Sequence, residues 1–292
     1  MTNTPHQACL DAPAATRYAY NLDGELTQIT RPDGQTLALG YSGCCGKLDY
    51  LDLPHGRIDY AYHPATGRLS GITTPENNTL AFTYDGFLPL TQSWSGEING
   101  SVDRGYDNNF QLQSLSVNGQ AITYSYDSDG LPIQAGDLTL ARDPANGFLT
   151  GTSLAGVATT QAYNGFGEMT AFSASHDATE LFSTSFSRDQ RGRISEKTET
   201  IAGITTHYVY HYDQAGRLIQ VNKDGGTAAT YTYDDNGNRL QHSAGGTTIT
   251  GSYDAQDRMT AYGNATYQYT ANGELLKKTQ GAQTTRYTYD VC

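Results

Sequence analysis

The chain has 292 residues, and its 30 acidic and 18 basic side chains give it a formal net charge of -12. A surface of that sign repels phosphate backbones and anionic lipids, and the longest basic run is Lys277-Lys278, so no nucleic-acid partner is expected. No apolar stretch approaches the roughly 20 residues of a membrane helix, so no membrane span is expected. Only 37% of the residues are hydrophobic, but 22 are Tyr and 32 are Gly, a composition that suits many strands joined by tight turns better than a thick aliphatic core.

Residues 1–17 are predicted to be an N-terminal extension that precedes a repeat domain spanning residues 18–292. The extension has neither a basic region nor an apolar region of the kind found in a secretory signal peptide. The protein is therefore expected either to be cytosolic when made or to have an export signal outside this segment, with any export depending on a specialised system.

From Tyr18 onward the chain repeats a short motif, in which a tyrosine and usually Asp or Asn precede a glycine and an apolar residue. Gly24 is the first such glycine and Gly273 the last, and the mean spacing is about 21 residues. Phe110 and Asp257 occupy the glycine position in two degenerate copies. The motif residues are Tyr20 and Gly24; Tyr62, Gly67 and Arg68; Tyr126, Asp127 and Gly130; Tyr212, Asp213, Gly216 and Arg217; Tyr233, Asp234, Gly237 and Arg239; Tyr253, Asp254 and Arg258; Tyr269 and Gly273.

Each copy predicts two strands and two turns. Before each glycine the tyrosines alternate, as at Tyr208, Tyr210 and Tyr212, which places them on one face of a sheet where successive repeats could stack them in aromatic ladders. After the glycine the apolar residues are three apart, which predicts a β-bulge or an early turn there. Asp213 and Arg217 flank their turn closely enough to pair.

About 26 strands in an all-β chain exceed what a flat open sheet holds, because such sheets rarely pass about ten strands without curling. One solution is a continuous antiparallel sheet of about 13 hairpin repeats that spirals into a partial hollow shell. The other is a β-propeller of six or seven blades. The modest apolar content favours the shell.

The segment Tyr212–Leu218, YDQAGRL, resembles the repeat of YD-repeat proteins of the Rhs class, which include bacterial polymorphic toxins, cocoon components of Tc toxins and, more distantly, teneurins. The resemblance implies a shell that encloses an unfolded toxic polypeptide, with other shell segments or a C-terminal toxin domain as partners and a secreted or cell-surface location. Toxin-bearing members end in a junction rich in Asp-Pro-x-Gly; here Asp143–Gly147 is interpreted as an ordinary repeat turn. The chain stops within a fresh motif copy, which predicts a segment of a longer protein whose exposed sheet edges could pair with a second copy.

Catalytic, metal and cofactor sites are not predicted. Cys44, Cys45, His55 and His63 lack metal-binding spacing, and the Asp-rich turns at 127–130 and 234–237 lack a complete calcium loop. The alternative to a structural shell is a module that binds carbohydrate or a cell-surface receptor, although the single tryptophan, Trp94, gives little support to glycan binding.

Overall fold

The computed structural model describes residues 15–43 and 45–289, and these form 27 β-strands and no helix. The first strands are β1 (Arg17–Tyr20), β2 (Leu26–Thr30), β3 (Thr36–Tyr41), β4 (Leu48–Leu53), β5 (Gly56–Tyr62), β6 (Leu69–Thr73), β7 (Thr79–Asp85), β8 (Leu88–Ser95), β9 (Gly100–Tyr106), β10 (Leu112–Val117), β11 (Gln120–Tyr126), β12 (Pro132–Ala135) and β13 (Leu138–Arg142). The others are β14 (Leu149–Leu154), β15 (Val157–Tyr163), β16 (Met169–His176), β17 (Thr179–Arg188), β18 (Ile194–Ile201), β19 (Ile204–Tyr212), β20 (Leu218–Lys223), β21 (Gly226–Tyr233), β22 (Arg239–Ala244), β23 (Thr247–Tyr253), β24 (Met259–Tyr262), β25 (Ala265–Tyr269), β26 (Leu275–Gln280) and β27 (Gln283–Arg286).

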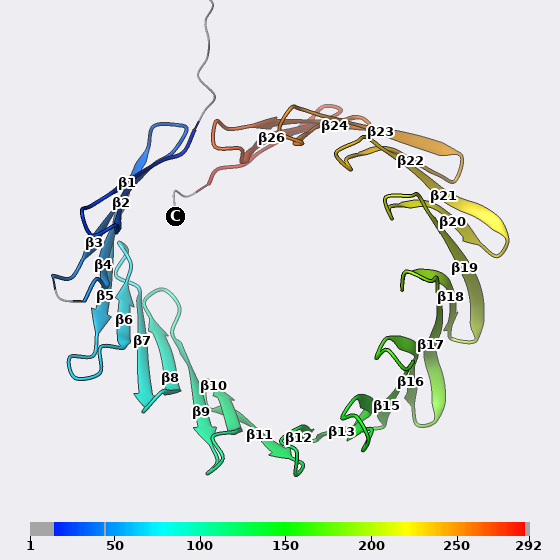
Figure 1. Ribbon diagram of the computed structural model, residues 1–292, viewed down its shortest axis with the longest axis horizontal. Coiled ribbons are helices and arrows are strands. Elements are labelled where there is room, and N and C mark those ends of the chain that lie inside the picture. The colour runs from blue at the N-terminus through cyan, green and yellow to red at the C-terminus, as the bar shows by residue number, and fades with distance from the viewer. Residues whose placement is uncertain (1–14, 44, 290–292) are drawn as a thin grey trace, which may run out of the picture. The chain divides into compact units, whose positions relative to one another are not determined.

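The strands belong to one antiparallel sheet of 27, in which strands that follow one another in the chain are neighbours (Figure 1). This confirms the predicted all-β, continuous antiparallel sheet, whose strand number is close to the 26 expected. A propeller is excluded because its blades would be separate sheets. Within the described part of the chain, no helix exists that could cross a membrane.

The chain divides into two compact units. The first contains the described residues up to Arg104, together with Val117–Gly119 and the described residues from Thr266 onward, and the second contains Gly105–Ser116 and Gln120–Ala265. The extension predicted for residues 1–17 lies mostly outside the described residues, and β1 begins at Arg17.

Two kinds of turn alternate along the chain. A YD turn follows the last residue of the strand that carries the motif tyrosine. We call the first residue of this turn the opening residue and its last residue the closing residue. In the turn between β19 and β20 these are Asp213 and Arg217. A return turn, such as Asp224-Gly225 between β20 and β21, reverses the chain at the other end of the strands. The YD-turn glycines have positive φ, as do Phe110 (63°) and Asp257 (60°) in the glycine position, so the two degenerate copies keep the same backbone.

The predicted bulge is present in repeat after repeat. In β19–β20, His211 pairs with Gln220 but Tyr212 pairs with Leu218, so Ile219 is the extra residue. The same register shift occurs at Tyr20, Tyr41 and Tyr62 and at their counterparts along the chain. It lets the residue directly after the YD turn, such as Leu218, face the same side as the tyrosine before it.

The sheet has one layer and two chemically different faces. Most motif tyrosines lie half-buried on what we call the tyrosine face. The opposite face, which we call the hydroxyl face, carries cross-strand pairs of Ser and Thr. The pairs include Thr79–Ser95 at 2.6 Å and Thr139–Ser153, Thr160–Ser173 and Ser243–Thr248, each at 2.7 Å. Among the described residues the buried apolar side chains are Leu53, Ala229 and Ala265 alone.

Candidate functional site: the ladder between YD turns

The opening residue organises each YD turn. One oxygen of Asp213 accepts the backbone N–H of Arg217 at 2.8 Å, and the other accepts Nε of the same arginine at 2.7 Å. These bonds, the backbone one first, lower the pKa of Asp213 below its usual value. Asp189–Arg193 and Asp254–Arg258 repeat the arrangement, which confirms the predicted Asp–Arg pairing across the turn.

A second solution uses an uncharged opening residue and a glutamate as closing residue. Asn164 accepts the N–H of Glu168 through its carbonyl oxygen and donates its amide to the Glu168 carboxylate at 2.7 Å. Asn21 with Glu25 and Thr270 with Glu274 do the same. In these six turns Asp is the opening residue where Arg closes, and Asn or Thr is the opening residue where Glu closes.

Successive YD turns are tied by the motif tyrosines. Seven of their hydroxyls donate to the backbone carbonyl of the residue that begins the strand after the preceding YD turn, at 2.7 to 3.1 Å. The donor–acceptor pairs are Tyr41–Leu26, Tyr62–Leu48, Tyr126–Leu112, Tyr163–Leu149, Tyr212–Ile194, Tyr233–Leu218 and Tyr253–Arg239. Burial raises the pKa of Tyr62, Tyr126 and Tyr233, so these hydroxyls keep their protons and remain donors.

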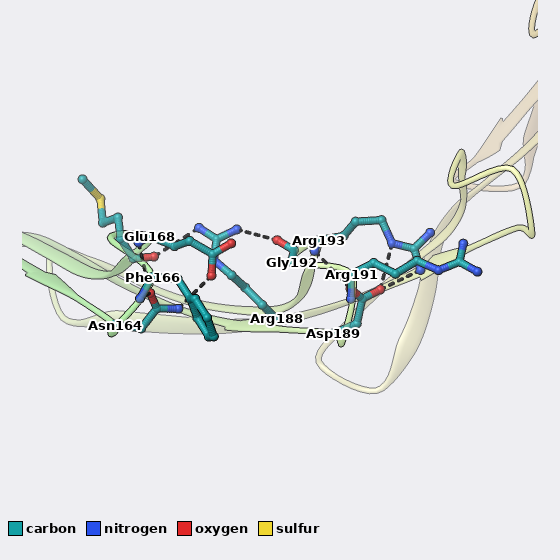
Figure 2. A network of polar contacts seen from close by, with 9 residues as sticks. Asn164, Phe166, Glu168, Arg188, Asp189, Arg191, Gly192 and Arg193 are labelled. Atoms are coloured by element: carbon teal, nitrogen blue, oxygen red, sulfur yellow. Dashed lines mark hydrogen bonds and ion pairs between the residues drawn. The ribbon is translucent and has the colours of Figure 1, made fainter.

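Two repeats have arginine where the others have tyrosine, and the arginine reaches the same acceptor. Arg142 donates to the carbonyl of Pro132 at 2.9 Å, and Arg188 donates to that of Met169 at 3.2 Å. Arg188 also donates to the carbonyl of Gly192 in the next YD turn and lies 3.6 Å from Glu168 in the previous one, so it bridges the two turns (Figure 2). The signal in the sequence is Arg-Asp in place of Tyr-Asp, as at Arg188-Asp189.

The closing residue makes a further contact with the next repeat. Arg193 lies 4.3 Å from the ring centre of Tyr212, Arg217 lies 5.0 Å from that of Tyr233, and Lys47 stands over Tyr62. Phe148 makes the same contact with Tyr163 through its ring, at 5.1 Å. Cations over a tyrosine ring are attracted by its negative face. In these four repeats the closing side chain therefore adds a second contact with the tyrosine of the next repeat.

Closing side chains also occupy the space over the next glycine. A Cβ added to Gly167 would stand 3.0 Å from the Phe148 ring, and one added to Gly147 would stand 2.6 Å from Leu131. Gly46, Gly130 and Gly192 are approached in the same way by the preceding closing residues. The YD-turn glycine thus provides both positive φ and room, and only the first requirement was apparent from the sequence.

The predicted motif residues take the following places. The tyrosines at 62, 126, 212, 233 and 253 are ladder donors, whereas Tyr20 is 61% exposed. Arg68 stacks over Phe87 and Tyr84, and Arg239 donates to the Tyr262 hydroxyl at 3.1 Å. Asp127 and Asp234 accept turn N–H groups, and Gly24, Gly67, Gly130, Gly216, Gly237 and Gly273 have positive φ. Tyr269 ends β25 just before the YD turn that contains Gly273.

The structure corrects the expectation of aromatic ladders between repeats. Among the described residues, the two tyrosine rings that stack on each other are those of Tyr208 and Tyr210, and both lie in the same strand. The motif tyrosines of neighbouring repeats are about 20 residues apart and are separated by an intervening strand, so hydroxyls and closing side chains bridge the gap instead of stacked rings. Trp94 of β8 is opposite Gly100 of β9 in the sheet, and its ring fills the space where a Cβ of that glycine would lie.

The structure also bears on the Asp143–Gly147 segment and on the cysteine and histidine set considered as a metal site. Asp143 caps its turn by accepting the N–H of Ala145, as predicted for Asp143–Gly147. Cys44 falls outside the described residues, so the Cys44–Cys45–His55–His63 set cannot be placed. Across residues 15–43 and 45–289, no group of three or more His, Cys, Asp or Glu side chains gathers as metal ligands would.

Comparison with known proteins identifies the fold. Over 96% of its length the chain is similar to the solved structure of TcdB2-TccC3-TEV, with 14% identity and a TM-score of 0.72, and over 93% to that of TcdB2-TccC3-Cdc42, with 14% identity and a TM-score of 0.69. The chain covers 19% and 18% of those two chains, about a fifth of their length. No curated protein sequence matches it.

The family model described as Teneurin YD-shell matches residues 7–292, almost the whole sequence. The single antiparallel sheet and the repeated YD turns agree with that match. The chain therefore belongs to the Teneurin YD-shell family.

Proposed function

We propose that this chain is a segment of the wall of a shell that encloses a toxic polypeptide and takes part in its delivery. The ladder between YD turns supports this proposal most directly. Its hydroxyl and closing-residue contacts all join one repeat to the next, which is what a wall needs in order to be long without a buried core. The fold is that of a YD shell and is similar to solved Tc toxin complexes.

The two faces suit different tasks in such a wall. The tyrosine face carries the ladder and its charged closing residues, and it gives the wall its stiffness. The hydroxyl face presents Ser and Thr side chains that already satisfy one another across the strands, as in Thr160–Ser173 at 2.7 Å. A surface of paired hydroxyls offers few unmet hydrogen bonds and no large apolar patch to an unfolded chain beside it, so it would adsorb such a chain weakly.

A structural role also accounts for the chemistry of the repeat without catalysis. The polar side chains of the YD turns are engaged with their own backbone or with the next repeat, as Asp213 is with Arg217, and this leaves them unsuited to act as acids or bases. The partners we propose are other segments of the shell and the enclosed polypeptide, and the location is secreted or at the cell surface. Residues 18–292 would be the repeat domain and residues 1–17 an extension.

The test uses the natural gene product that contains this chain. Limited proteolysis should leave the enclosed polypeptide uncut while the shell is intact. It should become cleavable when the ladder is broken by Arg188→Ala combined with Tyr233→Phe. The exposed Tyr18, replaced by Phe, is the matched control and should leave protection unchanged. An associated polypeptide that is cut equally fast with and without the intact ladder would contradict encapsulation.

A further inference from the structure

Four polar side chains join the beginning of the first unit to its end. Arg31 and Asp33 lie in the return turn between β2 and β3, and Asn272 and Glu274 lie in the YD turn before β26. The Arg31 guanidinium forms an ion pair with Glu274. Asn272 accepts the backbone N–H of Asp33 at 3.2 Å and donates its own amide to the Asp33 carboxylate at 2.6 Å. The paired residues are 243 and 239 positions apart in the chain.

The contact has the features of a specific junction. Side-chain exposure is 16% for Arg31 and 25% for Glu274, low values for a sheet with hardly any buried side chains. The amide of Asn272 is used in both directions, as donor and acceptor, which fixes how the two turns meet. A chance encounter of opposite charges on two exposed loops would not require this reciprocal pairing.

The junction reuses the chemistry of the ladder. Glu168 is a closing residue held by Asn164, and it faces the guanidinium of Arg188 in the following repeat. Glu274 is a closing residue held by Thr270, and it faces the guanidinium of Arg31. Arg31 therefore pairs with the closing residue Glu274 as Arg188 pairs with the closing residue Glu168. Arg31 differs in that it comes from the other end of the chain and from a return turn.

We propose that Arg31, Asp33, Asn272 and Glu274 form an intramolecular latch that holds the first and last hairpins of the first unit against each other. The latch joins a return turn to a YD turn and needs no backbone pairing between strands. By restraining these two hairpins it slows their local opening. This inference is independent of whether the shell encloses a toxin.

Crosslinking the isolated chain tests the latch directly. In a background with all four cysteines changed to Ser, Asp33→Cys and Asn272→Cys should be joined within one molecule by a short bismaleimide. The matched control pairs Asp33→Cys with Asp23→Cys, since the five residues of β2 between the two turns hold them roughly 17 Å apart. Linked peptides from a monomer, absent in the control, support the latch. No link, or links only in dimers, would overturn it.

Charge reversal gives a second readout. Arg31→Glu and Glu274→Arg should each speed hydrogen exchange several-fold in β1–β3 and β26–β27, and the double variant should return exchange at least halfway to the original rate. The Arg31 backbone N–H bonds to Gln35 independently of the side chain, so the turn itself persists in these variants. Single variants that exchange at the original rate, or a double variant as fast as the singles, would show that the four residues do not hold the hairpins together.

Discussion

The YD-turn glycines meet two separate requirements, a positive φ and room beside a neighbouring side chain, and two of them show the requirements apart. Gly237 has φ of 93° and open space where a Cβ would be, whereas Gly167 has φ of 78° and the Phe148 ring within 3.0 Å of that position. The first glycine is required by backbone conformation alone. The second is required by conformation and by its neighbour.

Alanine at these two positions should therefore differ in cost. Gly237→Ala should lower the free energy of unfolding by about 1–2 kcal/mol, the cost of a left-handed L-residue. Gly167→Ala should cost about 1 kcal/mol more, because Phe148 must also move. Urea denaturation of the two variants side by side measures the difference. Equal losses would show that the closing side chain gives way freely.

The ladder hydroxyls can be tested by removing a single atom. Tyr233→Phe leaves the ring over which Arg217 lies but takes the donor from the carbonyl of Leu218, 2.7 Å away. The expected loss is about 1 kcal/mol in the free energy of unfolding. Tyr18→Phe, at a ring that is 57% exposed, should change stability little. If the two substitutions cost the same, the hydroxyl contributes nothing.

At the scale of the element, the YD turn is a module with two alternative charge patterns. Arg217→Glu places a carboxylate beside that of Asp213 and removes the cation from the Tyr233 ring. Adding Asp213→Asn recreates the Asn–Glu pair found at Asn164–Glu168. The double variant should thus be more stable than Arg217→Glu alone yet less stable than the parent, since the Tyr233 contact stays lost. A double-mutant cycle by thermal denaturation checks the ranking.

The same turns set the response to pH. The pKa of Asp213 and of Asp189 is lowered in the fold, so their contribution is present above about pH 3.9 and is lost as the pH falls through the folded value. The pKa of Tyr62, Tyr126 and Tyr233 is raised, so theirs is present below about pH 10 and is lost as the pH rises further. Stability should hold between these limits and fall on both sides.

Two variants separate the acidic and alkaline limbs of that profile. Asp213→Asn should flatten the acid limb because one titrating turn carboxylate is gone, and Tyr233→Phe should flatten the alkaline limb. Unfolding midpoints recorded from about pH 2 to 11 give both slopes. An Asp213→Asn profile parallel to that of the parent below pH 4 would contradict the assignment.

At the scale of the whole molecule, stability comes from contacts between neighbours and not from a shared core. The buried apolar residues in the described part of the chain are Leu53, Ala229 and Ala265, and strands pair with their neighbours in sequence, as β18, β19 and β20 do. A perturbation should therefore stay local. In Tyr233→Phe, hydrogen exchange should accelerate in β19–β22 and remain unchanged in β4–β8. Uniform acceleration across both groups would indicate one cooperative fold.

The sequence predicted the sheet and the turns well because both have local causes. Alternating tyrosines predict strands, spacing of three predicts the bulge, and Asp213 with Arg217 predicts the turn pair. The ladder was missed because it joins residues such as Tyr212 and Ile194, which are 18 positions apart and come together only once the hairpin exists. Arg142 and Arg188 were missed because a pattern based on tyrosine does not detect a different donor that reaches the same acceptor.

That acceptor is a backbone carbonyl, and its use affects how such chains can change in length. A main-chain oxygen is present after every turn whatever the residue, so a newly duplicated repeat needs no complementary side chain on the repeat it joins. Duplication or deletion of one tyrosine-marked hairpin would preserve the bond at each new boundary. Walls of different extent could in this way arise by copying units of about 21 residues, without coordinated substitutions elsewhere.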